Sequence, residues 1–139
     1  MFKITTAPIR PDALFEWVLK PHHGAVVTFA GTVRDHAENR RTARLEYEAY
    51  AEMAEKKMRE IGDEIRAQWG IEDVAMLHRI GVLEIGEISI LIAVATPHRN
   101  AAFEACAYAI DRVKQVVPVW KKEIWADGAP EWVEGERHP

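Results

Sequence analysis

Residues 88–99 read ISILIAVATPHR, and they contain a change from strand-like to helix-like sequence from which the other elements can be placed. The first eight form the longest apolar run in the chain and predict a strand. Thr96 supplies a hydroxyl that can cap a helix, and Pro97 suits the first helical position. A helix that begins at Pro97 is expected to run to Val117, because Pro118 ends it.

Hydrophobic spacing predicts the other elements. Apolar residues at helical spacing predict an amphipathic helix over Met53–Trp69 and a shorter helix over Pro11–Leu19. Apolar or alternating runs predict strands over Gly24–Gly31, Leu45–Tyr50, Val74–Val82, Glu87–Thr96 and Trp120–Trp125. The polar segment Thr32–Thr42 is expected to be a loop, and Asp127-Gly128 a turn. This order predicts an α+β fold with helices packed on a largely antiparallel sheet.

The length and composition predict a single domain over residues 1–139. Apolar residues make up 48% and charged residues 29%, which is typical of a globular protein. No apolar run reaches the ~18 residues of a membrane span, and the N-terminus lacks a signal-peptide pattern. The single cysteine, Cys106, lies in an alanine-rich segment, which favours a buried residue over a reactive thiol. We therefore expect a cytoplasmic protein.

The charge balance argues against nucleic acid as a general partner. Eighteen basic and 22 acidic residues give a net charge of −4, whereas phosphate backbones require a basic surface. Any anion site must therefore be local.

His98 and Arg99 are the first candidates for such a site. They follow Pro97 at the predicted helix start, where the helix dipole disfavours cations. A bound anion, such as a phosphate, would explain them, because backbone amides at a helix N-terminus bind anions. The alternative is an ion pair between Arg99 and a carboxylate such as Glu104, with His98 at the surface.

Lys114 is the second anomaly, because it falls within the predicted apolar stripe of the same helix. That stripe consists of Phe103, Cys106, Ala107, Ile110, Val113 and Val117. Desolvation favours a neutral amine, which a nucleophile or proton acceptor requires. The alternative is that the lysine snorkels to solvent over the edge of the stripe.

Three further basic residues are candidates. Lys121 and Lys122 would face opposite sides of a strand, so only one of them can join Lys114, and the local pattern does not decide which. Arg34 follows the predicted strand that ends at Gly31. Functional side chains are frequent in such strand-end loops, but Arg34 can equally be an ordinary surface arginine.

Other chemistries lack a motif. The six histidines do not show metal-ligand spacing and there is one cysteine, so no metal site is expected. Glycine-rich nucleotide loops and the Gly-x-Ser-x-Gly elbow are absent from the sequence, which argues against nucleotide hydrolysis and serine-hydrolase chemistry. No cofactor is expected. The five tryptophans fit core and interface positions better than cofactor stacking.

Five segments also form an ordered set: residues 24–34 (GAVVTFAGTVR), 45–50 (LEYEAY), 78–81 (HRIG), 98–105 (HRNAAFEA) and 119–123 (VWKKE). Together they resemble the large (catalytic) subunit of molybdopterin synthase, the MoaE family. The likeness extends from about residue 3 to Glu134, and five motifs in order are far more specific than any single one.

The resemblance implies a sulfur transferase of molybdenum cofactor biosynthesis, with an α/β hammerhead-like fold and a small added subdomain. It implies a homodimer of large subunits within a heterotetramer. Each large subunit would bind a small ubiquitin-like subunit whose C-terminal Gly-Gly tail ends in a thiocarboxylate. The tail would deliver sulfur to cyclic pyranopterin monophosphate, and two sulfurs would build the dithiolene of molybdopterin. Neither nucleic acid nor a membrane is implied as a partner.

The resemblance also implies which residues form the site. Carried over by position, they are Thr32, Val33, Arg34, His98, Arg99, Lys114, Lys121, Lys122 and Glu123. Arg34, His98 and Arg99 would bind the substrate phosphate. Lys114 and Lys121 would be the two essential lysines, which resolves the choice between Lys121 and its neighbour. The sulfur would come from the partner, so this chain would need no sulfur-carrying cysteine.

Two departures from the family pattern weaken parts of this assignment. Thr32 stands where the family often has a basic residue, so one phosphate contact would be missing. Arg137 is displaced from the arginine expected after Trp132-Val133-Glu134, and it is not carried over.

Two other functions remain open from the sequence. One is a non-catalytic module that binds a phosphate ligand. The other is an interaction protein that recruits a ubiquitin-like partner without chemistry. The presence of two lysines together with the His-Arg pair argues against both.

Overall fold

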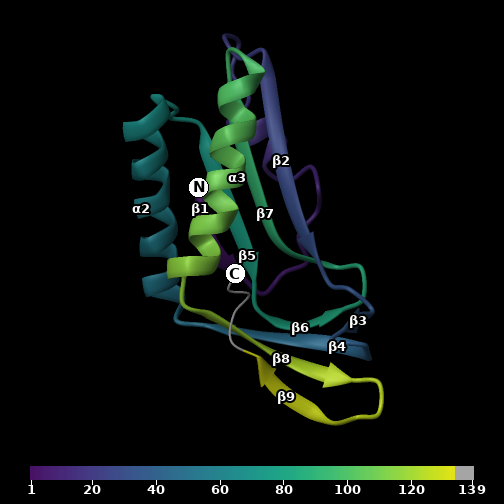
Figure 1. Ribbon diagram of the computed structural model, residues 1–139. Helices are drawn as coiled ribbons and strands as arrows, with labels where there is room; N and C mark the ends of the chain where they lie inside the picture. The colour runs from purple at the N-terminus through teal and green to yellow at the C-terminus, as the bar shows by residue number, and fades with distance from the viewer. Residues whose placement is uncertain (134–139) are drawn as a thin grey trace.

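The computed structural model describes residues 1–133, which form two β-sheets and three helices (Figure 1). The first sheet has the order β1 (Phe2–Thr5), β5 (Val74–Arg79), β7 (Ile88–Thr96), β2 (Ala25–Thr32). The second sheet has the order β3 (His36–Ala37), β4 (Arg40–Ala49), β8 (Val119–Trp125), β9 (Pro130–Val133), with β6 (Gly81–Glu84) also paired to β4. The helices are α1 (Phe15–Val18), α2 (Ala51–Trp69) and α3 (Arg99–Val116).

The predicted α+β fold is confirmed, including its largely antiparallel pairing. Among the pairs of described strands, β1 with β5 is parallel, and all the others are antiparallel. Figure 1 shows α2 and α3 covering the same face of the first sheet, while the second sheet lies beyond its end. None of the helices within residues 1–133 combines the length and apolar character that crossing a bilayer requires.

β7 is the centre of the core, and all nine of its residues are buried. Ile90, Ile92 and Val94 pack against α2 and α3 on one face of the first sheet. On the other face, Leu91 and Ala93 belong to a separate cluster with residues from the segment around α1. A strand covered on both faces is apolar throughout, which explains the long apolar run in the sequence.

The amphipathic helix predicted over Met53–Trp69 is present as α2, two residues longer at its start. Its buried residues are Ala54, Met58, Ile61 and Ile65, as the spacing predicts. The helix ends at Gly70, whose φ of 70° is a left-handed conformation that glycine adopts without strain.

The predicted start of α3 is wrong by two residues. The helix begins at Arg99, and the hydroxyl of Thr96 donates to the carbonyl oxygen of His98 at 2.6 Å instead of accepting from a helical amide. Thr96 is still the last residue of β7, so it cannot cap the helix. The predicted end holds within one residue, at Val116 before Pro118.

The apolar stripe predicted for α3 is displaced around the helix. The buried residues are Ala102, Ala105, Cys106, Ala109 and Val113, whereas Phe103 is 59% exposed and Ala107 is also exposed. Alanines let a helix approach a sheet and a neighbouring helix closely, so the alanine-rich side faces the core. Lys114 consequently lies at the edge of the buried face and is half-buried.

The strand predicted over Val74–Val82 is divided between the two sheets. β5 ends at Arg79 and β6 begins at Gly81, whose φ of 103° turns the chain sharply. β5 pairs with β7 in the first sheet, whereas β6 pairs with β4 in the second. This turn therefore joins the two sheets and brings the end of β5 beside the second sheet.

Two other predictions change, and one holds. Thr32–Thr42 contains the β3–β4 hairpin, whose turn residues Glu38 and Asn39 have φ values of 50° and 63°, so it is not simply a loop. The helix predicted over Pro11–Leu19 is reduced to α1. The turn at Asp127-Gly128 is present and leads into β9, which was not predicted. Glu134 and Arg137 lie outside the described residues.

Two methionines of α2 offer a matched test of this packing. Met58 is fully buried between the helices and the first sheet, whereas Met53 is 45% exposed. Met58→Ala is expected to lower the free energy of unfolding by about 2–5 kcal/mol, because it leaves a cavity. Met53→Ala should change it by less than about 0.5 kcal/mol. Urea unfolding of both variants measures the difference, and equal losses would contradict the assigned core.

Candidate active site

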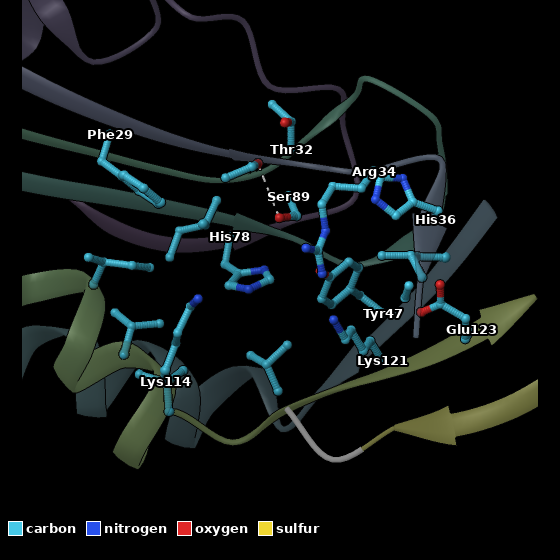
Figure 2. A pocket seen from close by; sticks show the side chains of 18 residues that line it. Phe29, Thr32, Arg34, His36, Tyr47, His78, Ser89, Lys114, Lys121 and Glu123 are labelled. Atoms are coloured by element: carbon cyan, nitrogen blue, oxygen red, sulfur yellow. Dashed lines mark hydrogen bonds between the residues drawn. The ribbon is translucent and has the colours of Figure 1, made fainter. Parts of the chain in front are cut away.

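A pocket of about 450 Å³ opens where α3 and the first sheet meet the second sheet (Figure 2). Its walls come from the end of β2, the end of β5, the C-terminal half of α3, and strands β4 and β8. Phe29, Ile110 and Val117 give it an apolar side. Other lining residues are polar or charged, so the pocket can hold a molecule with one flat apolar part and one charged part.

Three cations from distant parts of the chain line this pocket: Arg34, Lys114 and Lys121. Figure 2 shows their charged ends directed into the same space. Lys121 is only 7% exposed, and Glu123 is the single acidic residue among the lining residues of the described chain. A chain of net charge −4 thus carries a concentrated positive pocket, which is suited to an anionic ligand.

The end of β2 positions Arg34. The pairing of β2 with β7 shifts between Gly31 and Thr32, so Gly31 lies opposite Ile90 and Thr32 opposite Ile88. Such a bulge bends a strand and redirects the residues that follow. Gly31 is required there, because a Cβ would lie 2.8 Å from Cγ2 of the buried Ile90.

Thr32 and Val33 are neighbours in sequence, but Thr32 lies at the pocket and Val33 in the core. Thr32 lines the pocket, as the resemblance implies. Val33 is buried in a small cluster with Leu45 and Leu83, and its amide donates to the carbonyl of Glu87 at 3.0 Å. Val33 therefore anchors the turn that carries Arg34, and its side chain is not part of the pocket lining.

The alternation of β8 separates its two lysines as predicted. Lys121 and Glu123 line the pocket. Lys122 points away from it, with its Nζ 3.8 Å from a carboxylate oxygen of Glu46 and 5.2 Å from the ring centre of Trp132. The structure therefore does not bring Lys122 into the pocket, although the resemblance implies a place beside the substrate.

Glu123 is held by the neighbouring strand. It is buried, and its Oε1 accepts a hydrogen bond from the hydroxyl of Thr42 on β4. A buried carboxylate is stable only when it is hydrogen-bonded or paired with a cation. The basic residues of the pocket that Glu123 lines provide the positive charge that such a carboxylate needs.

His98 and Arg99 lie far from this pocket within one chain. Arg99 and Lys114 are 15 positions apart in α3, which corresponds to about 22 Å along the helix. Both residues are exposed and line a separate small hollow together with Gly24, Pro97 and Asn100. One copy of the chain therefore does not assemble these two residues and Arg34 around one phosphate. The alternative partner Glu104 accepts a hydrogen bond from Trp69 at 3.2 Å.

Among the pocket residues that sequence reasoning missed are Tyr47 and His78. Their ring centres are 5.3 Å apart in an edge-to-face arrangement. Tyr47 shares the inward face of its strand with Leu45. Tyr47 belongs to the family motif LEYEAY, and His78 belongs to the family motif HRIG. Neither motif indicates a pocket by itself, because the two residues meet only where the sheets join.

Cys106 does not line the pocket, and its buried thiol is expected to be unreactive. It is buried under α3 in the main core, and burial raises the pKa of its thiol to about 11. The prediction of a small buried residue is confirmed.

One group of possible metal ligands occurs within residues 1–133: His22, His23 and Asp73, outside the pocket. Asp73 already pairs with the ammonium of Lys20, and Nε2 of His23 lies 3.0 Å from its other oxygen. These contacts account for the group as an ion-pair cluster.

Comparison with known proteins gives a consistent result. The model of the MoaE protein family matches residues 4–116. The molybdopterin synthase catalytic subunit of Staphylococcus carnosus is 54% identical over 98% of this chain and 90% of its own length. The crystal structure of molybdopterin synthase from Staphylococcus aureus superposes with a TM-score of 0.91 at 47% identity, covering 95% of this chain and 96% of that one.

A more distant solved structure shares the fold. It is a protein–protein complex of subunits 1 and 2 of molybdopterin-converting factor from Helicobacter pylori. The matched chain has a TM-score of 0.79 at 22% identity, with 99% of this chain and 92% of that chain covered.

Proposed function

The chain belongs to the MoaE protein family, and we propose that its positive pocket is where sulfur is transferred to cyclic pyranopterin monophosphate. Its activity is that of the catalytic subunit of molybdopterin synthase, an enzyme of molybdenum cofactor biosynthesis. The observation that carries the proposal is the convergence of Arg34, Lys114 and Lys121 on one cavity in an acidic chain.

The substrate binds through its charge and its flat ring system. Arg34 offers a planar fork of donors that matches a phosphate group. The apolar side of the pocket, which includes Phe29 and Ile110, receives the pterin. Together these contacts hold the reacting carbon in a fixed position, which lowers the entropic barrier to reaction.

Lys114 and Lys121 act on the transferred group. The thiocarboxylate is an anion, and negative charge also develops on its carbonyl oxygen when the tetrahedral species forms. Two ammonium groups in a partly buried site stabilise both charges more strongly than water does. The half-buried setting of Lys114 and the buried setting of Lys121 support this role.

The sulfur donor is a small ubiquitin-like subunit with a C-terminal Gly-Gly thiocarboxylate. A tail without side chains can enter a narrow pocket beside the substrate. The two-subunit complex from Helicobacter pylori, which has the same fold, is consistent with such a partner. The heterotetramer, the single domain over residues 1–139 and a cytoplasmic location stay predictions from the sequence.

His98 and Arg99 serve a neighbouring site. The resemblance implies a homodimer, and the separation of about 22 Å prevents these residues from reaching the pocket of their own chain. Their exposed positions leave them available to a second copy. We therefore assign them to the phosphate end of the pocket in the other large subunit.

Replacing either pocket lysine tests the chemistry. Purified protein, a thiocarboxylated small subunit and cyclic pyranopterin monophosphate are expected to yield dithiolene product, measured by mass spectrometry. Lys114→Ala and Lys121→Ala should each lower the rate by roughly 100-fold or more, because charge stabilisation is lost. Lys122→Ala is the matched control, since Lys122 points away from the pocket. Wild-type protein that binds the small subunit but forms no product would leave only a binding function.

Mixed dimers test the shared site. Lys114→Ala and the double variant His98→Ala/Arg99→Ala are each expected to be nearly inactive. Co-expressed chains that pair at random should recover about a quarter of wild-type activity, because one site of each mixed dimer is intact. A mixture no more active than its two parents would contradict the assignment. Co-expression of two differently tagged Lys114→Ala chains controls for the mixing procedure.

Cys106 tests the source of the sulfur. Cys106→Ala should keep activity within about twofold, because a buried thiol with a raised pKa is a poor nucleophile. In the folded wild-type protein the thiol should resist a disulfide reagent at pH 8 and react after unfolding. Loss of sulfur transfer in a folded Cys106→Ala protein would show that the chain itself carries sulfur.

A further inference from the structure

Arg79 and Glu87 form an ion pair close to the pocket, although neither residue lines it. Nη1 of Arg79 lies 3.0 Å from Oε2 of Glu87, and the arginine side chain is only 12% exposed. Arg79 follows the pocket residue His78 and is the last residue of β5. Glu87 ends the loop between β6 and β7, residues 85–87. The functions assigned so far to the pocket residues do not use this pair.

The carboxylate of Glu87 also binds the start of its own loop. Its second oxygen, Oε1, accepts a hydrogen bond from the amide of Glu84 at 2.8 Å, and the amide of Glu87 donates to the carbonyl oxygen of Glu84 at 3.1 Å. The hydrogen bond from Glu84 and the contact with Arg79 hold the pKa of the Glu87 carboxyl below its usual range. The two oxygens of a charged carboxylate therefore join the β6–β7 loop to the end of β5.

This loop in turn holds the backbone beside Arg34. The amide of Val33 donates to the carbonyl oxygen of Glu87 at 3.0 Å, and the carbonyl oxygen of Val33 accepts from the amide of Gly86 at 2.9 Å. Both backbone polar groups of Val33 are thus bound to the loop, and its side chain is buried. The ion pair is therefore linked to Arg34 through hydrogen bonds of one loop.

The direction of the Arg34 side chain depends on this backbone. Arg34 lies outside the strands and is exposed, so core packing does not hold its side chain, which points into the pocket (Figure 2). A long side chain on a loosely held turn loses more conformational freedom when it binds a ligand, and a fixed turn lowers that cost. The guanidinium binds phosphate through a planar fork, so its orientation matters as well as its charge.

The ion pair is better suited to positioning than to stabilisation. A shielded ion pair adds little net stability, because the desolvation of both charges opposes their attraction. It does set the distance between the two segments that it joins. Here these segments are the end of β5, which carries His78 into the pocket, and the loop that holds Val33.

We infer that Arg79 and Glu87 are positioning residues, which hold Arg34 at the place where it binds the substrate phosphate. The hydrogen bonds run from Arg79 to Glu87 and from Glu87 to Val33, the residue before Arg34. The pair thereby sets the affinity of the pocket for a phosphate that it does not touch. This inference rests on the proposed function, which supplies the phosphate-binding role of Arg34.

The experiment measures the affinity for cyclic pyranopterin monophosphate by isothermal titration calorimetry. Glu87→Gln removes the charge, and its side chain has one accepting oxygen in place of two, so it cannot bind both Glu84 and Arg79. The dissociation constant is expected to rise about tenfold, because the guanidinium of Arg34 is misplaced. The rate of sulfur transfer at saturating substrate should stay within about twofold, since a phosphate contact acts equally in the ground state and the transition state.

A double-mutant cycle separates the positioning of Arg34 from a general loss of structure. In the Arg34→Ala background, Glu87→Gln should raise the dissociation constant by less than about twofold, because no guanidinium remains to be misplaced. A structural defect that is independent of Arg34 would instead multiply the two effects. Multiplied effects would therefore overturn the inference.

Glu64→Gln is the matched control for the loss of an arginine–glutamate contact. Oε1 of Glu64 lies 2.9 Å from Nε of Arg112 and joins α2 to α3, and the glutamate side chain is 35% exposed, as is that of Glu87. Its hydrogen bonds do not involve the turn that carries Arg34. The control should leave the dissociation constant within about twofold of wild type.

The outcomes distinguish this inference from the proposed function. Wild-type protein that binds the substrate but forms no product would overturn the proposed sulfur transfer, and a tenfold weaker Glu87→Gln protein would still support the inference. A folded Glu87→Gln protein with wild-type affinity would overturn the inference alone. If Glu87→Gln does not fold, Arg79→Met replaces it, since methionine fills a shielded site without a charge. Wild-type affinity of a folded Arg79→Met protein would equally refute the inference.

Discussion

The burial of β7 on both faces is the constraint on which the rest of the structure depends. One face of this strand needs the cover of α2 and α3, and the other needs the cover of the segment around α1. β2 and β5 pair with its two edges, so their ends are fixed relative to α3. The pocket is built from these ends, and its geometry therefore follows from the packing of one apolar strand.

The turn at Gly81 extends this constraint to the second sheet. β5 and β6 are almost continuous in sequence but belong to different sheets, so the two sheets are joined within a few residues of His78. β8 reaches the same place from the other direction, because its register with β4 sets Lys121 opposite Tyr47. The pocket lies at this junction of the two sheets, where residues of both sheets and of α3 line it.

The pocket brings basic side chains from three distant segments together. Arg34, Lys114 and Lys121 repel one another, and Glu123 is their single acidic neighbour among the lining residues of the described chain. An anionic ligand is attracted to these charges, so binding energy is available to orient the reacting groups. The overall negative charge of the chain does not oppose this, because charges more than about 10 Å apart are largely screened in salt.

The resemblance to a known family, rather than spacing, selected Arg34 and Lys121 as site residues. The sequence by itself determined the main helices and strands and the opposite orientation of Lys121 and Lys122. These follow from spacing along a short segment, which is visible in one dimension. Only the tertiary structure decided that Lys114 and not the start of α3 lies at the pocket, that Val33 is a core residue, and that His78 enters the pocket. The physical reason is that a pocket forms between segments far apart in the chain, where strand register and sheet junctions set distances that local patterns do not contain.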